Sequence, residues 1–186
     1  GDVVALKPGD TCQVVAHSNL GALINASPAL TEDRMYLRTA THLYCIGDAN
    51  GIQMLAHTAS AQGISAVENI CGRPHVVDHE SIPGACFTHP EVASVGLDED
   101  AAKARAQEQG FELGKAVSHF RANSKALAEG EGDGIVKLLF NKDTEQIVGA
   151  HIIGLHAADL ITEVANAKQS GTSIRDLAFT VHTHPT

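Results

Sequence analysis

Residues 135–171, IVKLLFNKDTEQIVGAHIIGLHAADLITEVANAKQSG, contain the change of hydrophobic pattern that decides the fold. Residues 135–140 and 146–153 are strand-like runs on either side of a polar turn, which predicts a β-hairpin. From His156 to Gln169 the apolar side chains follow the i, i+3, i+4 spacing of an amphipathic helix, and Gly171 ends it. A hairpin that leads into such a helix is typical of an antiparallel sheet with helices on one side.

The segment before the hairpin predicts further elements of the same α+β domain. Its expected strands are residues 82–87, 92–97 and 111–120. Asp98 can cap a helix from Glu99 to Gln109, because its carboxylate can accept hydrogen bonds from the first free N–H groups. Gly110 can adopt the left-handed conformation that ends this helix. A short helix is also expected near residues 174–178.

Earlier residues predict an α/β arrangement. The expected elements are strands at 35–37 and 43–46, a turn at 47–51 and a helix at 55–70. The run Leu43–Ile46 is apolar enough for a strand covered on both faces. Residues 75–81 form a polar linker, which is the expected boundary between two domains.

These patterns divide the chain into three parts. Residues 1–34 are the hardest to interpret, with possible strands at 3–6 and 13–16 around a turn at 8–10. Residues 35–78 are the α/β part, and residues 79–186 are the α+β domain.

The acidic composition argues against two classes of partner. Asp and Glu outnumber Lys and Arg by 22 to 13, for a formal net charge of −9. Nucleic acids and anionic membranes both attract basic surfaces, so neither is expected as a partner. No run approaches 18 consecutive apolar residues and the start shows no signal-peptide pattern, so we expect no membrane span. The start without Met indicates a processed product or a fragment.

The four cysteines form no recognisable pair. Cys12, Cys45, Cys71 and Cys86 lack both the CxxC and the CxxxxC spacing. Scattered cysteines are typical of reduced thiols, and Cys45 and Cys86 lie in apolar runs where a thiol is expected to be buried. No paired Cys and His spacing of the zinc-site type is present, so we predict no metal site.

Asp48 is the first candidate functional residue. It follows the apolar strand at 43–46, where its carboxylate could accept hydrogen bonds from ligand hydroxyls at the end of the sheet. A helix that begins near Leu55 would direct free N–H groups and its positive dipole end towards the same edge. A flavin that gains negative charge on reduction would be stabilised there. Taken alone, these residues also fit an ordinary turn.

His184 is the second candidate. Its imidazole is a natural acid/base group near neutral pH, and the following Pro185 excludes a helix at this position. His182 would point to the opposite face of a strand, so the two histidines are not expected to share a metal. Taken alone, they also fit an exposed terminal segment. Residues 87–91, FTHPE, are a third candidate and predict a rigid connector between strands.

Several motifs in the right order resemble the pyridine nucleotide-disulfide oxidoreductases. They are Tyr44–Gly51 (YCIGDANG), Met54–His57 (MLAH), Ala61–Gly63 (AQG), Phe87–Glu91 (FTHPE) and Val95–Leu97 (VGL). The terminal His182–Thr186 (HTHPT) is similar to the dihydrolipoamide dehydrogenase branch, and Gly154–Ile161 (GLHAADLI) is similar to its plastid and cyanobacterial members.

This resemblance implies a fold and a set of roles. Residues 35–78 would form the α/β edge of an FAD-binding domain, and residues 79–186 would form an interface (dimerisation) domain. Asp48 would bond the ribityl chain of FAD, and Met54, Leu55, Ala56 and His57 would contact the isoalloxazine ring. His184 would act as acid/base on dihydrolipoamide, across the dimer from the partner's cysteine pair, and electrons would pass through FAD to NAD.

The resemblance also implies partners and a compartment. The expected partners are a second copy of the chain and lipoyl groups, carried by 2-oxoacid dehydrogenase complexes or by the H protein of glycine cleavage. The expected compartment is the plastid stroma, or the cytoplasm of a cyanobacterium.

The sequence departs from the family pattern in four ways. It has no CxxxxC pair and no glycine-rich FAD or NAD loop, residues 1–34 match no motif, and no glutamate follows His184 by five residues. We therefore expect this chain alone not to oxidise dihydrolipoamide. An alternative interpretation is a catalytically incompetent dimerisation module without bound flavin.

Overall fold

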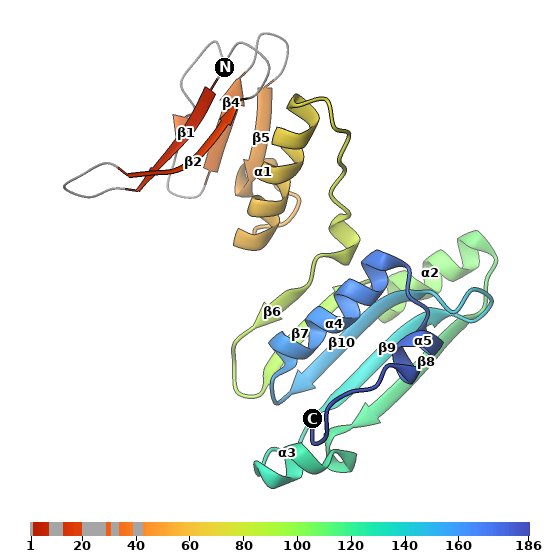
Figure 1. Cartoon of the computed structure of the whole chain (residues 1–186). Helices are drawn as coiled ribbons and strands as arrows, with labels where there is room; N and C mark the ends of the chain where they lie inside the picture. Colours follow the sequence, from red (N-terminus) through yellow and green to blue (C-terminus); the bar gives the residue numbers. More distant parts are fainter. Residues whose placement is uncertain (1, 8–12, 20–28, 31–33, 39–42) are drawn as a thin grey trace. The chain divides into compact units, whose positions relative to one another are not determined.

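The chain divides into two compact units, residues 1–79 and residues 80–186. The computed structural model describes residues 2–7, 13–19, 29–30, 34–38 and 43–186. Each unit has its own sheet structure and helices (Figure 1).

Short antiparallel strands and one helix make up the first unit. Strand β1 (Asp2–Lys7) pairs with β2 (Gln13–Asn19), and a second sheet has the order β3 (Ala29–Leu30), β4 (Arg34–Arg38), β5 (Leu43–Gly47). The four strands predicted from the sequence in this unit are present. The turn predicted at residues 8–10 lies outside the described residues.

Helix α1 (Ala56–Ile70) packs against β5, and it confirms the helix predicted at 55–70. Its buried face is largely polar, because Thr58, Gln62 and Ser65 are all buried. Buried polar groups are stable only when they are hydrogen-bonded. Thr58 Oγ1 donates to Gln53 Oε1 at 3.2 Å, and Ser65 Oγ donates to the carbonyl oxygen of His75 at 2.8 Å. The helix is therefore held by specific hydrogen bonds to the segments before and after it.

A five-stranded antiparallel sheet forms the base of the second unit. Its order is β6 (Gly84–Cys86), β7 (Glu91–Gly96), β10 (Ile147–Gly154), β9 (Ile135–Asn141), β8 (Leu113–His119). The hairpin predicted around residues 141–143 is the pair β9–β10. Figure 1 shows these strands side by side, with α4 (Ala157–Ser170) lying across β7 and β10.

The main core lies between α4 and one face of this sheet. Ala150 and Ala157 are fully buried, and Ile152 and Ile161 are only 2% and 1% exposed. These side chains pack in one cluster with Ala93 of β7 and with the neighbouring Val136 and Leu138 of β9. Small residues in the centre let the helix approach the sheet closely, so the burial of this apolar face is the main source of stability.

Phe120 closes the lower end of this core by packing on two glycines. A Cβ atom added at Gly154 would lie 2.3 Å from the Phe120 ring, and one at Gly134 would lie 2.8 Å from it. Both glycines also have φ angles that L-residues rarely adopt, 142° and 157°. Any larger residue at these positions would displace the ring. Phe120 thereby fixes the 3-10 turn η3 (Phe120–Ala122) and the helix α3 (Ser124–Ala128) that follows.

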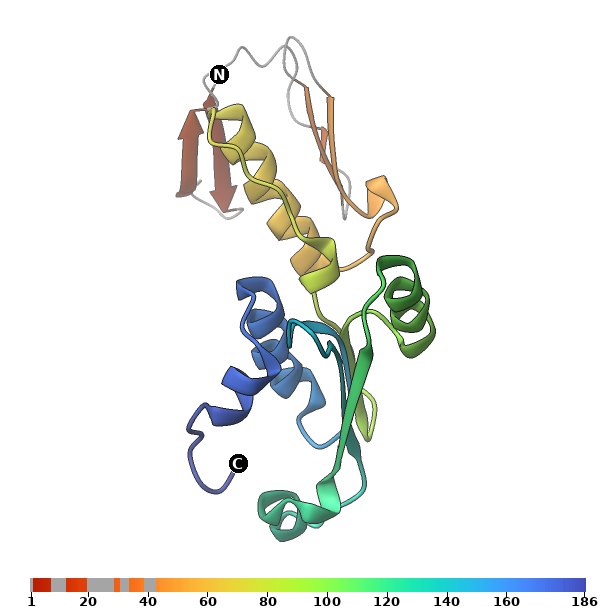
Figure 2. The same cartoon turned by 90° about the vertical axis from the view of Figure 1, so that its right-hand side faces the viewer.

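Helices cover both faces of the sheet, so the prediction of helices on one side is wrong. Ala150 faces α4, and strand alternation therefore places His151 and its neighbour Lys137 on the opposite face. Glu99 of helix α2 (Glu99–Gln109) bonds Lys137 at 3.4 Å, which places α2 on that opposite face. Figure 2 shows α4 and α5 (Ile174–Phe179) on one side of the sheet and α2 on the other.

The ends of α2 confirm the sequence prediction residue by residue. Asp98 accepts hydrogen bonds from the N–H groups of Asp100 and Ala101, at 3.0 and 2.8 Å. Gly110 follows the helix with a φ of 74°. At α4 the prediction is one residue off, because His156 is the N-cap with a φ of 56° and the helix begins at Ala157.

Glu91 accepts a hydrogen bond from the start of α4, a contact that the sequence did not suggest. Its Oε2 accepts from the N–H of Ala158 at 3.0 Å, and a carboxylate at a helix N-terminus is favourable. The connector FTHPE therefore ends in a side chain that joins β7 to α4.

The cysteines are exposed, and the prediction that Cys45 and Cys86 are buried is wrong. In β5, Ile46 is 5% exposed, and strand alternation places its neighbour Cys45 on the other face. Cys86 lies on the edge strand β6, where the last two residues are exposed. Cys71, after the end of α1, is exposed as well, and Cys12 lies outside the described residues.

We predict that the network around Glu99 makes stability depend on pH. Glu99 bonds Lys103, Lys115 and Lys137, and these cations lower its pKa from 4.5 to about 2. A carboxylate with a lowered pKa stabilises the fold above its unfolded pKa, and this contribution is lost as the pH falls through the folded pKa. Glu99→Gln should therefore lower the melting temperature at pH 7, and the difference from the parent should shrink below pH 4.5 and vanish near pH 2.

Circular dichroism melts at pH 7, 4.5 and 2.5 check this prediction. Glu108→Gln is the matched control, because it removes one charge from an exposed position on the same helix. A destabilisation by Glu99→Gln that is equal at all three pH values would contradict the assignment.

Candidate functional site

A turn at the end of β5 carries the first group of candidate residues. The 3-10 turn η1 (Asp48–Asn50) follows Gly47 directly. Gln62 of α1 holds this turn, because its Oε1 accepts from the N–H of Gly47 at 2.8 Å and from Asn50 Nδ2 at 2.7 Å. Gln62 is 8% exposed, so its bond to Gly47 is buried, and its bond to Asn50 is partly buried. The position of Asp48 therefore depends on a side chain two turns into the helix.

Gln62 also connects this turn to the end of the unit. Its Nε2 lies 3.0 Å from His79 Nε2, and Gln53 Nε2 donates to the His79 carbonyl oxygen at 3.0 Å. The sequence analysis identified Gln62 only as a helix former and as part of a motif. The sequence signal that could have indicated this role is a carboxamide side chain on the face of the predicted helix that packs against the preceding strand.

The start of α1 is exposed and has no side-chain cap. Leu55 is the N-cap in an extended conformation, and the first turn contains no acidic residue. Met54 is 75% exposed, and Ala56 and His57 are exposed as well. The positive end of the helix dipole thus favours a negative group at this end. Asp48 and the segment 54–57 belong to the same unit.

His184 lies in the terminal segment after α5. Residues 181–186 are not in a strand, so the argument that His182 and His184 face opposite sides of a strand does not apply. His182 Nε2 lies 2.5 Å from Glu163 Oε1 of α4, and this carboxylate raises the pKa of His182. His184 is exposed, and within residues 43–186 its ring has no hydrogen-bond partner. The His184 ring is therefore accessible to solvent.

The predicted residues fall into two groups, one in each unit. Asp48 and residues 54–57 belong to the first unit, and His184 belongs to the second. In the described part of the chain, no three His, Cys, Asp or Glu side chains are grouped to hold a metal ion. His75 and His79 do have an HxxxH spacing, but no α-helix spans them, because His75 precedes the 3-10 turn η2 (His79–Ser81), and His79 bonds Gln62.

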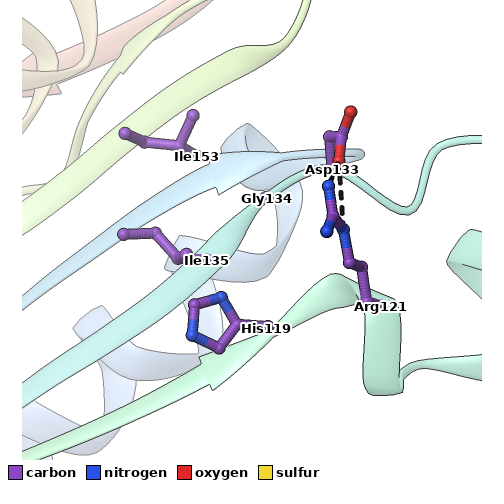
Figure 3. Close-up of a pocket in the computed structure, with 6 residues that line it drawn as sticks. All are labelled: His119, Arg121, Asp133, Gly134, Ile135 and Ile153. Atoms are coloured by element: carbon purple, nitrogen blue, oxygen red, sulfur yellow. Dashed lines mark hydrogen bonds and ion pairs between the residues drawn. The ribbon is translucent and has the colours of Figure 1, made fainter.

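An open depression lies on the face of the sheet opposite α4. Figure 3 shows Ile153, Ile135 and His119 side by side on β10, β9 and β8, beside the ion pair of Arg121 and Asp133. Arg121 Nη2 lies 2.7 Å from Asp133 Oδ1, and this carboxylate raises the pKa of Arg121. Both charges are largely exposed, so this is a surface feature and not an enclosed catalytic pocket.

A single row of side chains crosses all five strands at this depression. In register across the sheet they are Cys86, Val92, Ile153, Ile135 and His119. Val92 is 41% exposed and Ile153 is 38% exposed. Apolar side chains that share an open sheet face mark a surface for association.

Residues 82–186 match the family described as pyridine nucleotide-disulphide oxidoreductase, dimerisation domain. The chain belongs to this family. It is 58% identical over 145 residues to dihydrolipoyl dehydrogenase 2, chloroplastic, of Arabidopsis thaliana, and 55% identical over 145 residues to dihydrolipoyl dehydrogenase of Synechocystis. These alignments include 78% of the chain but 26% and 31% of the relatives, so the chain spans about a quarter to a third of their length.

The second unit's fold agrees with this family. The crystal structure of LpdA from Mycobacterium tuberculosis matches with a TM-score of 0.69 at 25% identity, over 77% of this chain and 30% of that one. Dihydrolipoyl dehydrogenase 3 of Haloarcula marismortui aligns over 184 residues at 34% identity, with 99% of this chain and 38% of the relative. That alignment includes nearly all of residues 1–34, the segment in which we recognised no family motif. Within the described residues no helix is long and apolar enough to cross a bilayer.

We predict that Gln62→Leu releases the turn that carries Asp48. Leucine fills similar space but leaves the Gly47 N–H without an acceptor, at a cost of about 1–3 kcal/mol. The Gly47 amide should then exchange with deuterium roughly 10- to 100-fold faster, as measured by NMR. Gln107→Leu, at an exposed position on α2, is the control. Unchanged protection of Gly47 in Gln62→Leu would rule out the role of this carboxamide.

Proposed function

We propose that the chain forms the C-terminal part of an FAD-dependent dihydrolipoyl dehydrogenase, which oxidises protein-bound dihydrolipoamide with NAD. The observation that carries the proposal is the 58% identity to a dihydrolipoyl dehydrogenase over 145 residues, together with the match of residues 82–186 to the dimerisation domain. In this proposal the first unit contacts the flavin, and the second supplies an acid/base histidine and the subunit interface.

Asp48 and residues 54–57 would hold the flavin part of FAD. The uncapped, exposed start of α1 and the half-buried carboxylate beside it suit this group. FAD held there would supply the acceptor for the electrons of the dithiol, with NAD as the final acceptor. The role of this chain is to stabilise negative charge near the ring with the α1 dipole and to orient the sugar-alcohol chain through Asp48, which Gln62 holds in place.

His184 would act on the thiol of dihydrolipoamide. Its exposed imidazole takes the thiol proton, and the resulting thiolate attacks an enzyme disulfide. The second substrate thiol then closes the lipoyl disulfide and leaves an enzyme dithiol, so that two electrons and two protons pass from substrate to enzyme. The 186 residues contain no CxxxxC pair, so the disulfide comes from outside this sequence. This agrees with the expectation that the chain alone is inactive.

A second copy of the chain is the proposed partner at the open sheet face. The row Cys86, Val92, Ile153, Ile135 and His119 can meet the same row of another protomer, which is how twofold interfaces form. The other proposed partners are lipoyl groups of 2-oxoacid dehydrogenase complexes or of the glycine cleavage H protein.

The proposal includes a compartment. The similarity to a chloroplastic relative supports the plastid stroma, and the similarity to a Synechocystis relative supports cyanobacterial cytoplasm as the alternative. A second candidate function is a dimerisation module that binds no flavin, which the missing cysteine pair favours.

We predict that Val92→Asp breaks the homodimer. The substitution places two charges in an apolar contact, where their desolvation has no compensation. Sedimentation equilibrium should show the mass fall from twice 19.5 kDa to 19.5 kDa. Val76→Asp, at an 89% exposed residue of the first unit, should leave the mass unchanged. A Val92→Asp chain that remains dimeric at micromolar concentration would place the interface elsewhere.

We predict that His184→Gln removes the acid/base. The test uses a chimaera in which residues 43–186 replace the matching segment of the Arabidopsis thaliana relative. The rate of flavin reduction by dihydrolipoamide, measured after rapid mixing, should fall by roughly 10²–10⁴-fold, which is the usual contribution of a positioned base. His75→Gln, at an exposed position of the first unit after α1, serves as the control.

Two results would argue against this function. A parental chimaera that binds no flavin and shows no reduction would favour the dimerisation module. A His184→Gln chimaera as fast as its parent would assign the acid/base role to another residue.

A further inference from the structure

The terminal segment that carries His184 is bonded at three points to separate elements of the second unit. It leaves α5 at Thr180, whose N–H donates to the carbonyl oxygens of Asp176 and Leu177 at 3.0 and 3.2 Å. His182 then contacts Glu163 on α4 at 2.5 Å. Finally, Asn123 Nδ2 donates to the Thr186 carbonyl oxygen at 2.7 Å.

The last two contacts lie on either side of His184. Each is two residues away, and the four-residue span between them can extend at most about 14 Å. Fixing both ends of so short a span removes most of its backbone freedom. The ring of His184 itself is exposed, so its position is set through the backbone and not by contacts of the ring.

Both anchoring residues are themselves firmly placed. Glu163 projects from α4, whose neighbouring residues Ile161 and Val164 are 1% and 7% exposed. Asn123 is the N-cap of α3, because its Oδ1 accepts from the N–H of Ala126 at 2.9 Å. Since Phe120 is packed on Gly134 and Gly154, the start of α3 is fixed to the sheet. The carboxamide thus caps a helix with its oxygen and holds the terminal segment with its nitrogen.

We propose that Glu163 and Asn123 are positioning residues that hold His184 in place for a substrate approaching from outside the unit. The inference rests on the proposed acid/base role of His184 and deepens it. Glu163 acts through His182, and Asn123 acts through the backbone of Thr186. Glu163 raises the pKa of His182, which agrees with an electrostatic contribution to this contact.

NMR on the complete 186-residue chain tests the positioning directly. In the parent, backbone order parameters of residues 182–186 should be near 0.85, the value of a rigid backbone. Glu163→Ala should lower those of residues 182–184 below about 0.6, the range of flexible chain. Asn123→Asp keeps the oxygen that caps α3 but loses the donor, so it should release Thr186 and leave α3 intact.

A conservative variant separates positioning from a general structural effect. Glu163→Gln can still bond His182, so order should be retained while the pKa of His182, followed by its ring carbon signals, falls towards its ordinary value. Glu108→Gln, which removes the same charge from an exposed position on α2, should change neither quantity. Order parameters that stay near 0.85 in both Glu163→Ala and Asn123→Asp would overturn the proposal, as would a His182 pKa that Glu163→Gln does not lower.

The chimaera distinguishes this proposal from the proposed function. In the chimaera that carries both Glu163→Ala and Asn123→Asp, flavin reduction should slow by roughly 10- to 100-fold, as expected for a displaced catalytic group. The chimaera with Glu163→Gln should keep a rate near that of the parent. If the segment is released in NMR but the doubly changed chimaera keeps its rate, positioning is overturned. If His184→Gln keeps the parental rate while the order parameters behave as expected, the acid/base role fails and the anchoring of the segment stands.

Discussion

The packing of α4 on the five-stranded sheet is the constraint on which the second unit depends. Ala150 and Ala157 have no exposed surface, so helix and sheet approach as closely as small side chains allow. This contact sets the direction of α4 and thereby the position of Glu163 on its outer side. The same sheet carries Gly134 and Gly154, whose missing side chains leave room for the Phe120 ring. The environment of His184 therefore derives from packing that lies well away from it.

The first unit follows a different physical rule. Its helix buries Thr58, Gln62 and Ser65, so hydrogen bonds and not apolar area decide how it lies against the strand end. The Gln62 carboxamide bonds three groups, which are the N–H of Gly47, the side chain of Asn50 and the ring of His79. Such a network has one best geometry, because moving the helix would leave several buried groups without partners. A turn held in this way is suited to present Asp48 to a ligand.

Local patterns predicted the elements well where the signal lies within a few residues. The limits of α2 follow from Asp98 and Gly110, since capping and left-handed glycine are local properties. Helix α3 was missed because Ser124–Ala128 is too short to show a helical period. The exposure of Cys45 and Cys86 was mispredicted because apolar neighbours in the sequence do not show which face of a strand is covered.

The amino-acid sequence by itself determined the kinds and order of the longer elements, the acidic net charge and the candidate residues Asp48, Met54–His57 and His184. Each of these depends on residue type and short spacing. Only the tertiary structure decided that α2 and α4 lie on opposite faces of the sheet, that one row of side chains crosses five strands, and that Glu163 and Asn123 bracket His184. These residues are 19 and 63 positions from their partners, and such contacts arise from strand register and helix packing, which no local pattern specifies.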